Sequence, residues 1–497
     1  MKQHVIIIGG GIAGLCAGVY ALRCGFRATI LESHSIAGGN CTSWKRGGYL
    51  FEGGMHWLTG SHPGEPLHKL WRTVGALDDS VTIHTGEPFI EYDHKGTPVR
   101  IYRDTDKTEQ HLLALSPVDE EAIKDLCSNM RKLRKLAMPV NDLRGVKVTK
   151  KRPPPFKLLL PAISAFILMR KFSNVSRNDY INRFRHEGIR ELLRSSTSEE
   201  TGVAPIFFTM GILSRGDGGF PEGGSLPFAG RIVKQFKSLG GELLLNTRAK
   251  RVIIENGAAK GVAIENSEAA LDADAVIITA DTMQMDHLFE SPPQASWLDE
   301  MRKNTQGTMV TFICLGVNAD LRKYQSGLVF QCAEPIKLAD QSYDFLSINN
   351  YANNPVYSPA GKAALTIQLG GDTYDYWKKA KAEGRYAEEK QDIADKVIAE
   401  LARMIPESAG NIEVIDVATP LTYERYCGNW RGSWMTEMTS GMKLKSYPAV
   451  IKHLKGVYFA GHRMMPPGGY PPAIMSGRAA VQHLCKDTGA VFVSESD

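Results

Sequence analysis

A glycine-rich turn near the start of the chain restricts the fold more than any other feature. The apolar run His4–Ile8 leads directly into the sequence GGGIAG at Gly9–Gly14. In a strand–turn–helix unit, Gly9 permits the tight turn, Gly11 lets a pyrophosphate approach the backbone, and Gly14 lets the helix pack closely on the strand. The N–H groups at the helix N-terminus then face the phosphates. The pattern predicts a buried parallel strand and a helix that together bind a dinucleotide.

A second strand and an acidic residue follow at the spacing that this unit requires. The helix is expected to run to about Cys24 and to end at Gly25, and Ala28–Leu31 is the next apolar run. Glu32 follows it, roughly 20 residues after the glycines, where an acid bonds the ribose hydroxyls of the adenosine. A glycine-rich turn that binds no ligand would not need a strand, a helix, a second strand and an acid at these spacings. The acid argues against a 2′-phosphate, but this segment leaves FAD and NAD both open.

The C-terminal end of the chain favours FAD. Val457–Ala460 is predicted as a strand that ends on Gly461, with His462 at its carboxyl edge. A Pro/Gly-rich turn then leads into a predicted helix over Ala473–Leu484, whose N-terminal dipole would favour negative charge on a reduced flavin ring. A simple NAD dehydrogenase does not need a segment from the C-terminal end of the chain to complete its cofactor site. No second GxGxxG of similar quality occurs, so a separate nicotinamide domain is not expected.

Length and cysteine content set the class of protein. The 497 residues are enough for two or more domains at ~150 residues each, and the net charge of +5 excludes little. The eight cysteines are scattered without a CxxC pair, which predicts a reduced, cytoplasmic protein without structural disulfides. The apolar run after Lys2 contains the glycine fingerprint and is therefore not interpreted as a signal peptide. No run reaches the ~18 apolar residues of a spanning helix.

A basic, acid-free stretch between Arg144 and Arg177 suggests contact with a membrane surface. It surrounds the almost wholly apolar segment Phe156–Met169, which is too short to span a bilayer but long enough to lie in its interface. Basic residues beside apolar surface suit an anionic leaflet. The alternative is a buried helix with a solvated basic rim. Nucleic acid is not an expected partner, because the basic residues border an apolar segment rather than a polar groove.

Secondary-structure patterns place the remaining elements. Residues 85–115 are expected to form short strands, and Ser116, Pro117 and Asp119 are expected to cap a helix over Val118–Met138. Strands are also predicted at Met309–Leu315 and Ala363–Leu369. The expected organisation has FAD-binding segments at 1–85, 219–284 and 446–497, and substrate segments at 86–218 and 285–445.

Glycine and proline motifs along nearly the whole chain resemble those of one superfamily. They are Gly9–Gly14 with Glu32, Gly38-Gly39, Phe51-Glu52-x-Gly54, Pro221-x-Gly223-Gly224-x-x-x-Pro227, Asp274-x-Val276-Ile277, and Gly461 with Gly469-Tyr470-Pro471. Together they resemble the bacterial-type phytoene desaturases, the carotenoid cis–trans isomerases and the retinol saturases. His56 beside Trp57 looks most like the retinol saturase branch. The chain departs from the common pattern at Asn40, where an Arg is frequent, and at His462, where an Asp or Glu is frequent.

The resemblance implies an α/β fold and a class of reaction. The fold would be a Rossmann-like FAD-binding domain of the glutathione reductase and amine oxidase type, with a mixed α+β substrate domain and a long apolar tunnel. The reaction would be desaturation, saturation or redox-neutral isomerisation of a lipophilic, isoprenoid substrate taken from a membrane. The enzyme would then be cytoplasmic and peripheral on the inner face of the membrane, with NAD(P)H, a quinone or oxygen as the electron partner.

Candidate site residues follow from these motifs and from the resemblance. The cofactor-binding candidates are Gly9, Gly11, Ile12, Ala13, Gly14, Glu32, Gly38, Gly39, Asn40, Gly54, Met55, Val252, Ala280, Gly461, His462, Gly469, Tyr470 and Ala473. The catalytic candidates are His56, because a histidine is suited to proton transfer near neutral pH, and Tyr470. The candidates for the channel wall are Tyr423, Tyr426, Trp430 and Trp434. No metal ligand is expected.

Three alternatives stay open at this level. His56 could bond only to the backbone or to the cofactor. The protein could be a flavin amine oxidase that acts on polar amines, although such enzymes lack a basic, acid-free apolar insert. It could also be a non-catalytic protein that binds flavin or lipid.

Overall fold

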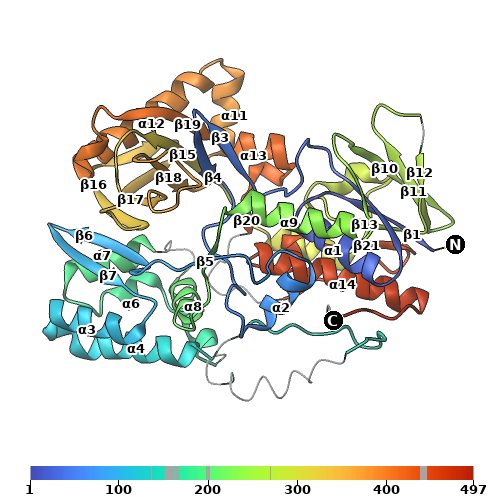
Figure 1. Cartoon of the computed structure of the whole chain (residues 1–497), viewed down its shortest axis with the longest axis horizontal. Coiled ribbons are helices and arrows are strands. Elements are labelled where there is room, and N and C mark those ends of the chain that lie inside the picture. The colour runs from blue at the N-terminus through green and yellow to red at the C-terminus, as the bar shows by residue number, and fades with distance from the viewer. Residues whose placement is uncertain are drawn as a thin grey trace.

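The computed structural model describes residues 2–135, 137–150, 163, 167–196, 202–268, 270–436 and 445–495. Two large sheets organise these residues, and Figure 1 shows them side by side. The first is a parallel sheet with the strand order β21–β13–β1–β2–β9. Its strands are β1 (His4–Ile8), β2 (Arg27–Leu31), β9 (Glu242–Leu244), β13 (Ala275–Ile278) and β21 (Val457–Phe459). Segments from the start, the middle and the end of the chain therefore share one sheet.

Both faces of this sheet are covered, which explains why its strands are continuous apolar runs. One face packs against three helices, α1 (Ile12–Arg23), α9 (Ser225–Ser238) and α14 (Tyr470–Thr488). The other packs against a small antiparallel sheet of β10 (Ala249–Glu255), β11 (Ala258–Ile264) and β12 (Ala270–Asp272). A Cβ atom at Gly477 of α14 would lie 2.4 Å from the backbone oxygen of Ala13, so glycine is what lets α14 approach α1. The predicted α/β class is confirmed.

The second large sheet has seven strands in the order β19–β15–β18–β17–β16–β6–β7. Its strands are β6 (Ile90–His94), β7 (Thr97–Ile101), β15 (Val310–Val317), β16 (Gly327–Leu338), β17 (Gln341–Asn350), β18 (Ala363–Gly370) and β19 (Ile412–Ala418). Helices α11 (Tyr374–Ala382) and α12 (Tyr386–Met404) bury one of its faces. The β6–β7 hairpin joins the sheet through a parallel pairing of β6 with β16, which links two segments far apart in sequence.

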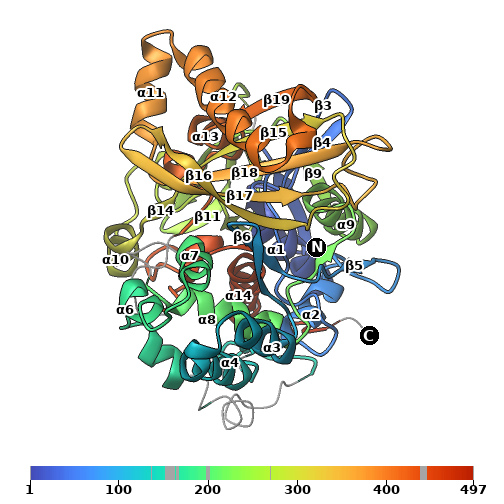
Figure 2. The ribbon, with the colours of Figure 1, turned by 90° about the vertical axis from the view of Figure 1, so that its left-hand side faces the viewer.

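A helical layer lies below this sheet in Figure 2. It contains α3 (Thr105–Leu115), α4 (Glu120–Leu133), α6 (Arg177–Ile181), α7 (Glu187–Ser195) and α8 (Ala204–Leu213). Residues 105–115 were expected to form strands, and this prediction was wrong. Asp104 caps α3, because its Oδ1 accepts hydrogen bonds from the backbone N–H groups of Asp106 and Lys107.

The helix expected over Val118–Met138 is shorter and starts differently. Residues 117–119 form a 3₁₀ turn, and α4 runs only from Glu120 to Leu133. The Ser116 hydroxyl donates to Asp119 Oδ2 at 2.8 Å instead of capping the helix. Asp119 also accepts the backbone N–H groups of Arg185 and His186, so a tertiary contact replaces the predicted capping box.

Short elements connect these layers. They are β3 (Ser43–Arg46), β4 (Tyr49–Glu52), α2 (Pro66–Thr73), β5 (Ile83–His84), β8 (Phe220–Pro221), α10 (Ser296–Asn304), β14 (Gly307–Thr308), α13 (Pro420–Cys427), β20 (Met435–Thr436) and the 3₁₀ turns at 285–288, 406–408, 430–432 and 462–464.

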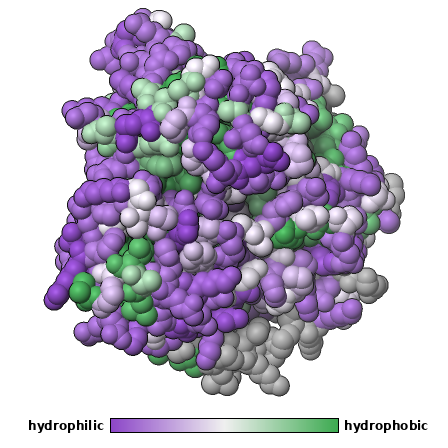
Figure 3. Space-filling view, turned by 60° about the vertical axis from the view of Figure 1, so that its left-hand side comes forward, coloured by the Kyte–Doolittle hydropathy of each residue, from purple (hydrophilic) through white to green (hydrophobic). Residues whose placement is uncertain are grey.

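The basic stretch 144–177 is described only in part. Residues 151–162 and 164–166, which include most of the apolar segment Phe156–Met169, lie outside the described residues. None of the helices in the described part is both long enough and apolar enough to cross a bilayer. On the face seen in Figure 3, hydrophobic side chains form separate patches among hydrophilic ones.

Candidate active site

A cavity of about 930 Å³ opens at the carboxyl ends of the parallel strands. Its wall includes the residues that end or follow four strands: Ile8 and Gly9 after β1, Leu31 and Glu32 after β2, Thr279 and Ala280 after β13, and Ala460 and Gly461 after β21. Ligands of open α/β sheets bind at this edge. The volume is at the upper end of the ~300–1,000 Å³ of ordinary ligand sites.

Two helices direct their N-terminal ends at this cavity. Gly11 precedes α1 and Gly469 precedes α14, and both glycines line the cavity. In the described structure neither helix has a side-chain cap or an acidic residue in its first turn. Their N–H groups and positive dipole ends are therefore available to an anionic ligand. A dinucleotide that carries a pyrophosphate and an electron-rich ring fits this arrangement.

Glu32 is held in place at the end of β2. Its Oε2 accepts the backbone N–H of Gly10 at 2.7 Å, and its Oε1 accepts the N–H of His34 at 2.8 Å. The side chain is buried and lines the cavity. A Cβ atom at Gly10 would lie 3.0 Å from Glu32, so the glycine turn and the acid pack directly on each other. The carboxylate therefore stands where a ribose-binding acid is required.

His462 carries an unsatisfied polar group on the cavity wall. Both ring nitrogens are buried, and neither has a hydrogen-bond partner among the described residues. Burial, with a smaller contribution from the adjacent Arg463, lowers the pKa of His462 to about 3, so the ring is neutral at physiological pH. Leaving a buried polar group without a partner costs about 1–3 kcal/mol. A bound ligand that hydrogen-bonds this ring would remove that cost.

A buried ion pair lies beside His462. The Arg463 guanidinium donates from Nε to Asp281 Oδ1 at 2.7 Å and from Nη2 to Asp281 Oδ2 at 2.8 Å, and both side chains are only 2% exposed. Burial acts to raise the pKa of Asp281, but the charge and hydrogen bonds of Arg463 outweigh it and lower the pKa. Both residues line the cavity. The pair links the end of β13 to the turn that follows β21.

Glu52 fixes the loop that the resemblance placed near the flavin. It is fully buried, and its carboxylate accepts the backbone N–H groups of Gly54, Met55 and Ser225. Burial raises the pKa of Glu52, and these hydrogen bonds offset the effect only in part. Because Ser225 begins α9, the carboxylate also occupies the positive end of that helix.

Two aromatic side chains hold the same loop from the other side. Tyr423 Oη donates to the backbone oxygen of Gly53 at 2.9 Å, and Trp434 Nε1 donates to the same oxygen at 3.0 Å. The Asn40 side chain donates to the Trp434 backbone oxygen at 2.9 Å and accepts from Asn429 at 2.7 Å. Asn40, at the position where an Arg is frequent, thus joins the glycine turn to the aromatic wall.

His56 lies behind Trp434 and not on the lining of the cavity. Its Nε2 is 2.7 Å from Gln368 Nε2, and its ring lies 6.2 Å from Phe312 and 5.3 Å from Trp434, between centroids. Burial lowers the pKa of His56 to about 4. The imidazole is therefore neutral near pH 7.

The structure brings most of the candidate residues together on one wall. The predicted cofactor residues that line the cavity are Gly9, Gly11, Ile12, Ala13, Glu32, Gly38, Gly39, Asn40, Ala280, Gly461, His462, Gly469, Tyr470 and Ala473. Those outside the lining are Gly14, Gly54, Met55 and Val252. Of the aromatic candidates, Tyr423, Tyr426 and Trp434 line it and Trp430 does not.

Sequence reasoning missed several lining residues. Thr247, Arg248 and Ala249 line the cavity where Val252 was expected, whereas Val252 is buried in the core between the two sheets of this half. Asp281 was also missed, although it directly follows the predicted strand that ends at Ala280. The rule that ligands bind after the carboxyl ends of strands would have found Asp281. Nothing in the sequence indicated which residue of β10 faces the cavity.

Comparison with known proteins agrees with this geometry. Residues 12–485 match the family of flavin-containing amine oxidoreductases. A 4,4′-diapophytoene desaturase from Methylomonas is 23% identical over 97% of this chain and 94% of that protein. An all-trans-retinol 13,14-reductase from Danio rerio is 21% identical over 86% of this chain and 76% of that protein.

A solved structure shares the fold. Putrescine oxidase, in a variant redesigned for cofactor binding, superposes with a TM-score of 0.63 at 15% identity and covers 98% of this chain and 99% of its own. At this identity the likeness shows the fold alone. The family match covers nearly the whole chain, and it confirms the resemblance that the motifs indicated. The chain therefore belongs to the family of flavin-containing amine oxidoreductases, and it is an FAD-dependent oxidoreductase.

Proposed function

We propose that FAD is held along the cavity by the residues at the carboxyl edge of the parallel sheet. The N-terminus of α1 would bind the pyrophosphate, Glu32 a ribose, and the N-terminus of α14 the electron-rich edge of the flavin ring. Supporting this placement, both helix N-termini lack a side-chain cap in the described structure and line one cavity. Bound FAD supplies a ring that accepts or donates a hydride. The side chains bind and orient it, and they exclude water.

We propose that the substrate is a lipophilic isoprenoid alkene and that the reaction is desaturation, saturation or isomerisation of a carbon–carbon double bond. The observation that carries this proposal is the match, over 97% and 86% of this chain, to a desaturase and a reductase whose names specify diapophytoene and all-trans-retinol. Tyr423 and Trp434 give the cavity wall an aromatic surface against which an apolar chain can pack. Chemistry of this kind needs few reactive side chains, since the protein mainly positions the double bond.

The test of this function is an anaerobic assay with the two redox states of the enzyme. Oxidised and photoreduced protein are each mixed with 4,4′-diapophytoene, with all-trans-retinol and with putrescine, and the flavin spectrum is followed together with the products. Reduction of oxidised enzyme by the polyene indicates desaturation, and reoxidation of reduced enzyme indicates saturation. A geometric isomer formed without a change in flavin absorbance indicates isomerisation. Reduction by putrescine alone would favour an amine oxidase, and no change with any of them would favour a binding protein.

We also propose that the enzyme takes its substrate from a membrane surface near residues 144–177. Within the described part of this stretch, Ile163 and Ile167 are 45% and 63% exposed, and Arg170 and Lys171 lie three and four residues after Ile167. Exposed apolar side chains next to cations suit an anionic leaflet. Sedimentation with vesicles tests the proposal, and more protein should bind to phosphatidylglycerol vesicles than to phosphatidylcholine vesicles. Equal binding to the two kinds of vesicle, or no binding to either, would contradict it.

His462 should contribute to FAD affinity. In His462→Leu the two unsatisfied ring nitrogens disappear together with any hydrogen bond that they make to the cofactor. We expect FAD to dissociate roughly tenfold more easily, as loss of one ligand hydrogen bond of about 1.5 kcal/mol predicts. Fluorescence titration of the apoprotein with FAD measures the effect. Unchanged or tighter FAD binding would mean that the ring only fills space.

His56 should act as a neutral polar group that supports Trp434 on the cavity wall. For His56→Ala with full FAD occupancy we expect kcat to fall on the order of 10²-fold, as a misplacement of about 1 Å in the wall that positions the substrate can cause. Because burial lowers the pKa of His56 to about 4, kcat should show no His56 inflection between pH 6 and 8. Gln368→Leu, which removes the neighbouring amide, should lower kcat less. Unchanged turnover in His56→Ala would remove this residue from the mechanism.

A further inference from the structure

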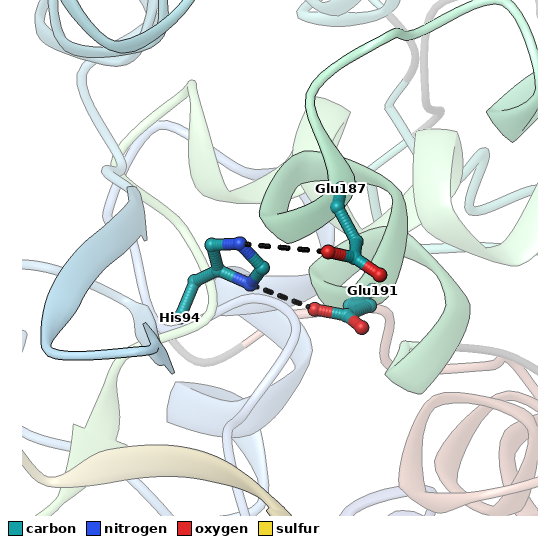
Figure 4. Close-up of side chains that lie close together, drawn as sticks. All are labelled: His94, Glu187 and Glu191. Atoms are coloured by element: carbon teal, nitrogen blue, oxygen red, sulfur yellow. Dashed lines mark hydrogen bonds and ion pairs between the residues drawn. The ribbon is translucent and has the colours of Figure 1, made fainter.

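We propose that His94, Glu187 and Glu191 form a binding site for a divalent transition-metal ion such as Zn²⁺, at the junction of β6 and α7. The three side chains converge from two elements in Figure 4. One ligand atom from each lies within 4.8 Å of the other two. His94 Nδ1 is 3.0 Å from Glu191 Oε2, and His94 Nε2 is 3.9 Å from Glu187 Oε2. None of the three lines the flavin cavity, so the site does not depend on the proposed function.

Helix geometry brings the two carboxylates together. Glu187 and Glu191 lie four positions apart on α7 and therefore share one face of the helix. His94 is the last residue of β6 and packs against the first turn of α7. A Cβ atom at residue 188 would lie 2.7 Å from His94 Cγ, so Gly188 is what lets the imidazole approach the helix. The arrangement is thus specified by the sequence of α7 as well as by the position of the hairpin.

The charge of the cluster is what a cation would balance. Glu191 is only 6% exposed, and within the described residues only His94 forms an ion pair with it. A buried carboxylate normally has a cationic partner or binds a metal. Glu187 is 52% exposed and contacts Lys95, whose side chain is 74% exposed. An ion pair at that exposure contributes little, so the lysine is a weak competitor for the site.

A neighbouring group orients the buried ligand. Tyr92 Oη donates to Glu191 Oε2 at 2.6 Å, which fixes the carboxylate in the manner of the outer partners of metal ligands. The exposed side chain of Glu187 leaves the outer side open to water as a further ligand. One imidazole with two carboxylates is a donor set for Zn²⁺ or a similar transition metal, whereas Ca²⁺ and Mg²⁺ prefer oxygen alone. Such an ion would cross-link the β6–β7 hairpin to α7.

Metal titration of the FAD-loaded full-length protein tests the site. After chelator treatment, Zn²⁺ is added in competition with a fluorescent chelator, and the stoichiometry and affinity are read directly. We expect one equivalent to bind to the wild-type protein, and His94→Gln, Glu187→Gln and Glu191→Gln each to weaken binding at least tenfold. His84→Gln is the matched control, since His84 is an exposed histidine on β5 outside the cluster, and it should bind as the wild type does.

The variants separate a metal site from a structural ion-pair network. Glu187→Gln changes a half-exposed side chain, so it tests the site even if the substitutions at the buried positions impair folding. Flavin absorbance and thermal unfolding in the presence of chelator report folding independently of the metal. Absence of zinc binding by the wild type would overturn the proposal, as would wild-type affinity in the folded Glu187→Gln and His94→Gln proteins.

Discussion

Gly14→Val is expected to destabilise the protein and to abolish stable FAD binding. A Cβ atom at this position would lie 1.9 Å from the backbone oxygen of Gly9, and Thr279 Oγ1 is 3.0 Å away. Backbone cannot yield as a flexible side chain can, so α1 must move away from β1. Overpacking of this kind costs roughly 3 kcal/mol. Because the N-terminus of α1 lines the cavity, the same movement displaces the N–H groups available to the pyrophosphate.

Gly230→Ala provides a matched control for this prediction. Gly230 lies in α9, which covers the same face of the sheet, but a Cβ atom there would meet nothing within 4 Å. We expect a gain of about 0.5 kcal/mol from the reduced entropy of the unfolded chain, and unchanged FAD content. Urea unfolding and the flavin absorbance per mole of protein measure both effects. Wild-type stability and FAD content in Gly14→Val would contradict the close packing of α1 on the glycine turn.

Asp281→Ala should be the most damaging single change among the charged residues of the cavity wall. It leaves the Arg463 guanidinium 2% exposed without its bidentate partner, and it removes the acceptor for the Trp430 backbone N–H at 2.8 Å. Breaking one side of a buried ion pair costs about 3–5 kcal/mol. Denaturant unfolding of the single variants and of Asp281→Ala/Arg463→Met measures this. We expect the double variant to be less destabilised than the sum of the single ones, and strict additivity would contradict the pairing.

The destabilisation caused by Asp281→Ala should depend on pH in a way that follows from the direction of the pKa shift of Asp281. The pKa of Asp281 is lowered in the folded state, so the folded state binds its proton less readily than the unfolded state. The stabilisation is therefore complete above the ordinary aspartate pKa of about 4, and it is lost as the pH falls through the lowered folded-state pKa. The difference in unfolding free energy between wild type and Asp281→Ala should be constant from pH 8 to about 5. It should shrink only at more acidic pH.

Local sequence determined the elements whose chemistry is contained within a few residues. The turn Gly9–Gly14, the acid Glu32 and the strand before Gly461 could all be identified, because turn geometry and the periodicity of a buried strand depend on neighbouring residues. The cofactor edge of the sheet was predictable for the same reason. Most of the residues named for it line one cavity, although they come from both ends of the chain.

Long-range contacts decided what the sequence patterns did not. Asp119 has the spacing of a capping box, yet it binds the N–H groups of Arg185 and His186, about 66 residues away. The β6–β7 hairpin completes a sheet whose other strands begin at Val310, and no local pattern specifies such a pairing. Val252 and Ala249 pack in the same core, but only Ala249, at the start of β10, also lines the cavity, because the fold decides which end of the strand lies next to it.

The same distinction applies to the reactive groups. The sequence identified His56 and His462 as residue types suited to a flavin site. Only the fold placed both rings where burial keeps them neutral, set His56 behind Trp434, and left the His462 nitrogens unpartnered within the described structure. The sequence gives the type of each side chain. Its solvation and its neighbours are set only when distant segments pack together, and the solvation and neighbours determine its pKa and its hydrogen-bond partners.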